Sequence, residues 1–170
     1  MLLTGCRPGE AARIKWADVD VKGRTIAIRG SKSGADIIVP MSAAIARGLK
    51  LARDSVEGES DFVFPGRAGH IAKGDDGLPV AGHALRHTWR TVAHECEIDE
   101  LSAHLLLGHA PQGVSAKYLR TLALSLGPGL RKAQRTISKR IVALLNPTVK
   151  APALSPDGPQ GAEVTLLPVP

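Results

Sequence analysis

Residues 24–40 read RTIAIRGSKSGADIIVP, and this stretch decides the fold class. Two short runs, 24–29 and 37–40, have the β-branched composition that is typical of strands. Between them lies GSKSGAD, residues 30–36, whose glycine, serine and aspartate favour tight turns. The pattern predicts an antiparallel hairpin that carries Lys32 near its tip.

Most of the remaining chain has helical signals. The predicted helices are residues 9–19, 42–56, 81–96, 99–108 and about 129–145. Ser42 is the expected N-cap of the second helix, and Gly108 is expected to end the fourth. The last helix is predicted to bury one apolar stripe, made of Leu130, Ala133, Ile137, Ile141 and Leu144. With a short strand or extended piece at 61–64 and a loop at 66–79, the order predicts a mainly α domain with a small antiparallel β-sheet, an α+β fold.

The composition changes at Pro147. Residues 147–170 carry six of the twelve prolines and show no helical period, so they are predicted to be a disordered tail. Residues 1–146 are expected to form one domain. Its opening, MLLTG, resembles the end of a helix more than a beginning, because it has no capping residue and no lead-in.

The charge balance points to an acidic partner. Lys and Arg number 22 against 16 Asp and Glu, the net charge is +6 and the isoelectric point is near 9.7. Such a balance favours nucleic acid, although it also serves solubility alone. Cys6 and Cys96 are isolated, and the sequence shows no signal peptide and no apolar run long enough to cross a bilayer. These features predict a cytoplasmic protein without a membrane partner.

Two groups of basic residues are candidates for chemistry. Arg7 lies between a helix end and a helix start, where its guanidinium could bind a phosphate; the alternative is a surface arginine paired with Glu10. His83, Arg86 and His87 share one helix face, since residues three and four apart are neighbours. That face could equally be ordinary surface or, through the two histidines, a zinc site. The Glu of HExxH and further ligands are missing, so no metal is predicted.

Three other residues also have simple explanations. Lys32 could protect an exposed turn, and His109 could bind the last carbonyls of a helix. Tyr118 is the only tyrosine and could anchor the last helix. Together, however, arginines, a lysine, histidines and a tyrosine suit the cleavage of a phosphodiester. Arginines neutralise the phosphate, a tyrosine hydroxyl attacks phosphorus and a lysine protonates the leaving oxygen, with no metal or cofactor required.

Four segments in this order resemble the motifs of the tyrosine recombinase (phage integrase) family. TGCRPGEAARIKWADVD, residues 4–20, is similar to the first-arginine box, and SKSGADIIVP, residues 31–40, to the hairpin with the catalytic lysine. HALRHTWRT, residues 83–91, is similar to the H-x-L-R-H-T box, and LLLGHAPQGVSAKYLR, residues 105–120, to the L-G-H box with its tyrosine. The resemblance covers roughly residues 1–145 and implies a recombinase catalytic domain.

The resemblance also implies a role for each matching residue. Tyr118 would be the nucleophile that joins the DNA 3′ phosphate and frees a 5′ hydroxyl. Arg7, Arg86 and His109 would hold the non-bridging phosphate oxygens. The bond energy would be kept in the phosphotyrosine, so no cofactor is implied.

Lys32 would be the general acid for the leaving oxygen, and His83 would activate Tyr118 or accept its proton. His87 would contact DNA together with Arg7, Lys32 and Arg86, and Glu10 would support the site.

The resemblance leaves three functions open. The first is a site-specific recombinase or integrase that acts on double-stranded DNA and assembles on it, as a tetramer in the full-length family. The second is a nicking and closing enzyme like type IB topoisomerases. The third is a non-catalytic DNA-binding remnant, because Met1 falls where family members are already in mid-domain and the chain looks truncated. Ile37 also stands where many relatives have a second basic residue before the Val-Pro pair.

Overall fold

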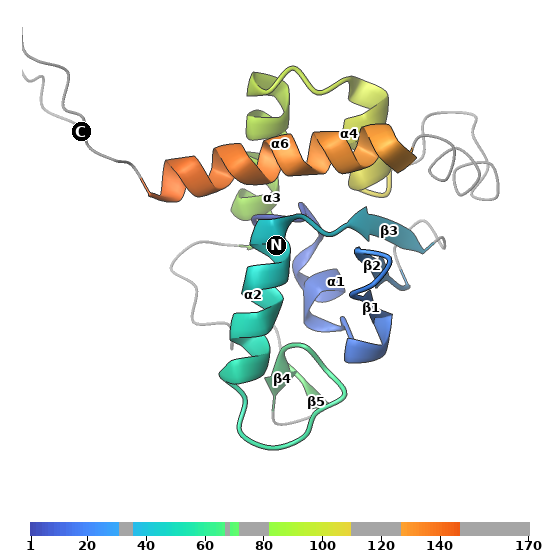
Figure 1. The fold of residues 1–170 in the computed structure, drawn as a ribbon, viewed down its shortest axis with the longest axis vertical. Coiled ribbons are helices and arrows are strands. Elements are labelled where there is room, and N and C mark those ends of the chain that lie inside the picture. The colour runs from blue at the N-terminus through green and yellow to red at the C-terminus, as the bar shows by residue number, and fades with distance from the viewer. Residues whose placement is uncertain (31–35, 67–68, 72–81, 110–126, 147–170) are drawn as a thin grey trace, which may run out of the picture.

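The computed structural model describes residues 1–30, 36–66, 69–71, 82–109 and 127–146 (Figure 1). In chain order the elements are α1 (Pro8–Ala12), η1 (Trp16–Asp18), β1 (Val19–Asp20), β2 (Thr25–Ile28), β3 (Ile37–Pro40), α2 (Ala43–Asp54), β4 (Pro65–Gly66), β5 (Gly69–His70), α3 (Gly82–Glu95), α4 (Glu100–Leu106) and α6 (Gly127–Leu145). The α6 helix runs across α3 and α4 and also contacts α2 and β3 (Figure 1). The predicted α+β class is confirmed.

The predicted hairpin is confirmed as an antiparallel pair. β2 pairs with β3, with Ile28 opposite Ile37 next to the connecting loop. The structure adds a third strand that the sequence did not predict, since β1 pairs with the other edge of β2. The base of the loop is fixed by Arg29, which donates to Asp18 at 2.6 Å and to Asp36 at 3.0 Å. Lys32 lies outside the described residues.

The predicted helix over residues 9–19 is wrong beyond its first turns. α1 ends at Ala12, and the chain then becomes extended. The carbonyl of Ile14 accepts from the Val63 amide at 2.9 Å, and the Trp16 amide donates to Asp61 at 2.8 Å. This exchange with residues 61–63 buries Ile14 and satisfies its backbone better than a continued helix, because the partner segment passes alongside. The extended piece predicted at 61–64 takes part in this pairing.

The caps of the other helices follow the sequence signals. The Ser42 hydroxyl accepts from the Ile45 amide at 3.2 Å and begins α2 as predicted. Asp99 caps α4, where its carboxylate accepts from the Ser102 amide at 2.8 Å; this bond holds the pKa of Asp99 below its usual range. Gly108 follows α4 in the left-handed region with φ 66°, as expected of a residue that ends a helix.

The last predicted helix is confirmed and begins at Gly127. Four of the five residues of its predicted stripe are buried: Leu130, Ala133, Ile137 and Ile141. They join Trp89, Leu106 and other apolar residues of α3 and α4 in the largest core cluster. Leu144 is 47% exposed, so its assignment to the stripe was wrong. The last turn of α6 extends past the elements that cover the rest of the helix (Figure 1).

A second part of the core lies under the sheet. Ile28, Ile37 and Val39 pack with Cys6 and Ala11. The remaining sheet and α2 residues form an adjoining cluster that includes Ile26, Ile45 and Val63. The predicted loop at 66–79 contains the short strand β5 within its described residues. Among the helices described, none is long and apolar enough to cross a membrane. The proline-rich segment 147–170 lies outside the described residues.

Candidate functional site

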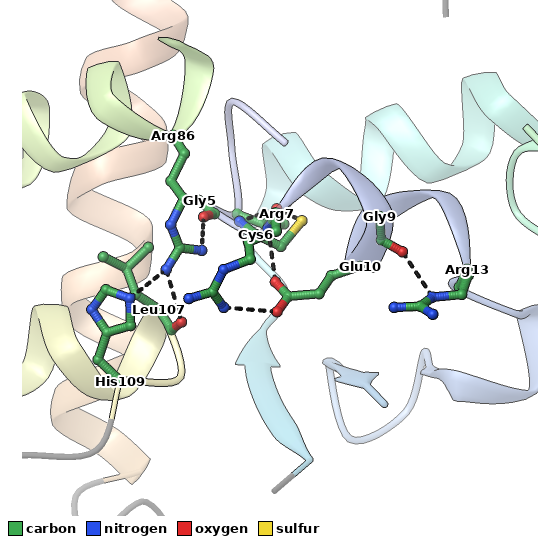
Figure 2. A network of polar contacts seen from close by, with 10 residues as sticks. Gly5, Cys6, Arg7, Gly9, Glu10, Arg13, Arg86, Leu107 and His109 are labelled. Atoms are coloured by element: carbon green, nitrogen blue, oxygen red, sulfur yellow. Dashed lines mark hydrogen bonds and ion pairs between the residues drawn. The ribbon is translucent and has the colours of Figure 1, made fainter. Parts of the chain in front are cut away.

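The centre of the site is the guanidinium of Arg86, which α3 buries to 7% exposure. Its Nη1 donates to the carbonyl of Gly5 at 2.6 Å, and its Nη2 donates to the carbonyl of Leu107 at 3.2 Å. Nη2 also donates to Nε2 of His109 at 2.8 Å (Figure 2). One side chain therefore joins the start of the chain, α3 and the end of α4.

Two glycines allow this close approach. Gly5 has φ 68°, and a Cβ built on it would lie 2.6 Å from Leu107 Cδ2 and 2.8 Å from the Trp89 ring. Only glycine fits both the conformation and the space, so its carbonyl can reach Arg86. Gly108 has the same left-handed conformation, and a Cβ there would collide with Ile37 of β3. The segment that carries His109 therefore rests directly on the strand that follows the hairpin loop.

His109 is a hydrogen-bond acceptor in this arrangement. A guanidinium only donates, so Nε2 of His109 carries no proton and the ring is neutral. Burial, followed by the charges of Arg86 and Arg7, lowers the pKa of His109 below its usual range. The ring of His104 meets it edge to face with centroids 5.7 Å apart. A neutral imidazole beside two cations is ready to respond to an incoming negative charge.

Arg7 is the second cation of the site. It precedes α1, and its side chain is 33% exposed. Its Nη1 donates to Glu10 Oε1 at 2.9 Å, and its backbone amide donates to Glu10 Oε2 at 2.7 Å (Figure 2). Glu10 is buried at 4% exposure, so the carboxylate holds Arg7 from both ends. The predicted pairing with Glu10 is thus present, and it orients Arg7 toward Arg86 (Figure 2).

The site has an excess of positive charge. Within the described part of the chain, no ion pair joins Arg86 to a carboxylate; its partners are two carbonyls and an imidazole. Burial, and then the charge of Arg7, lowers the pKa of Arg86. A buried cation is costly unless a negative charge compensates it. The arrangement therefore suits an anion that comes from outside.

The other predicted site residues fall into two groups. His83 and His87 are exposed on α3, one turn before Arg86 and next to it. Lys32 and Tyr118 lie outside the described residues. The expectation that the basic residues converge is met by Arg7, Arg86 and His109, whose side chains meet in Figure 2.

Two other types of site were considered. Over the described residues, no group of three or more His, Cys, Asp or Glu lies together as a metal would require. A hollow of about 530 Å³ lies between η1 and the end of α2, lined by residues that include Lys15, Trp16, Arg53 and Asp61. It shares no residue with the Arg86 site and has both signs of charge, so we do not assign the chemistry to it.

The comparison with protein families agrees with the sequence motifs. Residues 1–123 match the family described as the phage integrase family. The chain belongs to this family. The match spans the segments of Arg7, Arg86 and His109, and it reaches past Tyr118.

Curated proteins give the same result. The chain is 28% identical over 145 residues to the tyrosine recombinase XerA of Thermococcus onnurineus, covering 76% of this chain and 50% of that protein. It is 31% identical over 133 residues to the putative integrase/recombinase y4qK of Sinorhizobium fredii, covering 68% of this chain and 42% of that protein. This integrase-family chain therefore spans about half the length of the curated relatives that it matches.

Solved structures confirm the recombinase catalytic-domain fold. The integrase from mycobacterium phage Brujita aligns with a TM-score of 0.62 at 19% identity, over 84% of this chain and 53% of that one. The Tn1549 transposon integrase, solved in complex with circular intermediate DNA, aligns with a TM-score of 0.52 at 20% identity, over 69% of this chain and 50% of that one.

The sequence reasoning missed two residues that shape the site, Gly5 and Gly108. Both occur within the motifs, in TG before Cys6 and in LG before His109. A glycine next to a candidate catalytic residue was the available signal, because it often marks a left-handed turn or a close approach. The partner that makes each glycine necessary lies far along the chain, so the contact itself had no local signature.

Proposed function

We propose that this chain is the catalytic part of a site-specific DNA recombinase or integrase, which breaks and rejoins DNA through a 3′-phosphotyrosine at Tyr118. The observation that carries the proposal is the buried Arg86 guanidinium, held by neutral acceptors beside Arg7 and His109. A phosphodiester is the anion that completes such a site. The names of the relatives support DNA as the substrate, since they are recombinases and integrases.

The geometry explains how the site would stabilise the reaction. A guanidinium has five N–H donors, and Arg86 makes three hydrogen bonds, so two donors are left for phosphate oxygens. Arg7 adds a second, partly exposed fork. Negative charge on the non-bridging oxygens increases as the fifth bond to phosphorus forms, and donors fixed in a buried site stabilise it strongly.

His109 would change its role when the phosphate binds. In the described state Nε2 accepts from Arg86, whereas an imidazole can assist a phosphate oxygen only as a donor. The phosphate's negative charge offsets the nearby arginines and raises the pKa of His109 from its lowered value. The imidazole can then take up a proton and donate it in a hydrogen bond.

The proposed chemical steps balance without a cofactor. The Tyr118 oxygen forms a bond to phosphorus while the bond from phosphorus to the 5′ oxygen breaks. Lys32 gives a proton to the 5′ oxygen, and the tyrosine proton leaves through His83. Rejoining reverses each step, with a 5′ hydroxyl as the attacking group. His87, on the same face of α3 as His83, contacts the DNA backbone.

A trapped covalent adduct tests this function. The substrate is a set of duplexes with varied sequence, each nicked so that the cleaved fragment diffuses away and rejoining is prevented. The full chain should become linked to a DNA 3′ phosphate, and Tyr118→Phe should bind DNA without forming the adduct. An adduct that persists in Tyr118→Phe contradicts the mechanism. DNA binding with no adduct in either chain identifies a non-catalytic DNA-binding protein instead.

We also propose that copies of the chain assemble on DNA. Leu144 and Leu145 at the end of α6 are 47% and 61% exposed and offer an apolar contact for a second copy. Light scattering with and without duplex DNA tests this. Complexes with more than one chain per duplex are expected, and Leu144→Ser should reduce them; single chains on every duplex contradict the proposal.

A further inference from the structure

The exposed face of α3 continues beyond the proposed catalytic residues. Four side chains follow one another at spacings of four, three and four residues: His83, His87, Arg90 and His94. Residues at these spacings lie on one face of a helix, and all four are exposed. The first two belong to the proposed site, whereas Arg90 and His94 have no role in it.

Arg90 is placed close to the site. It follows Arg86 by four residues, which is about 6 Å along the helix axis. Its charge lowers the pKa of both Arg86 and His109, behind the larger effects of burial and Arg7. Among the described residues Arg90 takes part in no ion pair, whereas Arg29 and Lys50 are paired with carboxylates. An unpaired cation beside a buried one raises the cost of the site further unless an anion covers both.

We propose that Arg90, with His94 one turn further on, is a phosphate-binding track that leads the DNA backbone away from the Arg86 site. The proposal rests on the proposed function, because it assigns the same DNA to a longer surface. The face fits a polyanion: from residue 83 to residue 94 it carries no acidic residue. The first one is Glu95, which lies 3.5 Å from Arg140.

The exposed face of α6 is the competing surface. It has Arg131, Lys132, Arg135 and Lys139 on the side opposite its buried stripe. It has more charge than the α3 face, but it is not continuous with Arg86, and no contact links it to the site residues described. Arg135 is therefore a matched control: the same residue type, exposed on a helix, in a different place.

The test measures how the affinity of the full chain for a labelled duplex changes with salt. Each phosphate contact contributes about 0.9 to the slope of log affinity against log salt. Arg90→Gln should lower that slope by about 0.9, so that the affinity lost between 50 and 200 mM salt becomes ~3.5-fold smaller. Arg135→Gln should leave the slope unchanged, and Arg90→Lys should retain it.

The other outcomes overturn the inference. Equal effects of Arg90→Gln and Arg135→Gln mean that only net charge matters, and an effect of Arg135→Gln alone assigns the track to α6. An unchanged slope in Arg90→Gln, with the Tyr118 adduct intact, rejects the track and leaves the proposed function standing. Failure of the wild-type chain to bind DNA at all rejects both. Unchanged circular dichroism and thermal midpoint show that Arg90→Gln is folded.

Discussion

The helices α3 and α6 each bury one large polar side chain, with opposite consequences. In α6, Gln134 is fully buried, and its amide donates to the Leu3 carbonyl at 2.7 Å and to the Ser138 hydroxyl at 3.0 Å. In α3, Arg86 is nearly as buried, but it carries a charge that no carboxylate pairs within the described residues. A buried amide can be satisfied by packing alone. A buried cation of this kind needs a ligand, so the difference separates a structural helix from a functional one.

The packing role of α6 gives the largest expected effect. Ile141 is 2% exposed, so Ile141→Asp places a carboxylate in the core and should lower the free energy of unfolding by about 4 kcal/mol or more. Leu144→Asp is the matched control in the same helix and should change it by less than ~0.5 kcal/mol. Denaturant unfolding measures both. Equal effects would mean that α6 does not pack on its own domain.

The next effect distinguishes chemistry from stability. Arg86→Met keeps most of the side-chain length and should slow adduct formation by roughly 10²–10³-fold, because the main oxyanion donors are lost. The free energy of unfolding should change by less than ~2 kcal/mol, since the lost hydrogen bonds are offset by the removal of a buried charge. Gln134→Met should cost a similar ~1–2 kcal/mol and leave the adduct rate unchanged.

Single-turnover rates and urea unfolding measure these two quantities side by side. The comparison between the helices fails if Gln134→Met slows the adduct as much as Arg86→Met does. It also fails if Arg86→Met forms the adduct at the wild-type rate.

A smaller effect concerns the glycine that brings the start of the chain to α3. Gly5→Ala forces a side chain into the left-handed region and against Leu107 and Trp89, so it should cost about 2–3 kcal/mol. Gly48→Ala lies within α2 with open space around it and should instead stabilise the chain by roughly 0.5–1 kcal/mol. Thermal unfolding measures both signs. A neutral Gly5→Ala would show that this close approach is not required.

The smallest effect is the pH dependence from His109. Its folded-state pKa is lowered, so the unfolded chain binds more protons and stability should fall as the pH drops below about 6.5. His109→Gln keeps an acceptor for Arg86 but cannot titrate, so its stability should fall less over the same range. Unfolding at pH 7.5, 6.5 and 5.5 measures the difference between the two chains. Identical curves would contradict a neutral, acceptor His109.

The sequence predicted the parts of this molecule that depend on local signals. The hairpin at 24–40, the Ser42 cap and the α6 stripe up to Ile141 follow from turn residues, caps and period. The helix at 9–19 was predicted too long, because Ile14 gains a partner at Val63 that no local pattern reveals. The third strand and the exposure of Leu144 likewise depend on what lies nearby in space.

The same division holds for the site. Arg7, Arg86 and His109 could be picked from motifs, and the structure brings their side chains together. Neither the acceptor state of His109 nor the use of the Gly5 and Leu107 carbonyls was visible in the sequence. Both depend on segments far apart in the chain, which only the packing of α3 against α4 brings within hydrogen-bonding distance.

The central claim is that the Arg86 site is where DNA phosphate binds, and the ring nitrogens of His109 report on it most directly. In ¹⁵N NMR of the imidazole-labelled chain, free Nε2 should show the resonance of an unprotonated acceptor. Adding a short duplex should shift it strongly, and the shift should be absent in Arg86→Met at a DNA concentration that keeps the variant bound. If the wild-type chain binds the duplex while the His109 resonances stay where they were, the phosphate lies elsewhere and the account is contradicted.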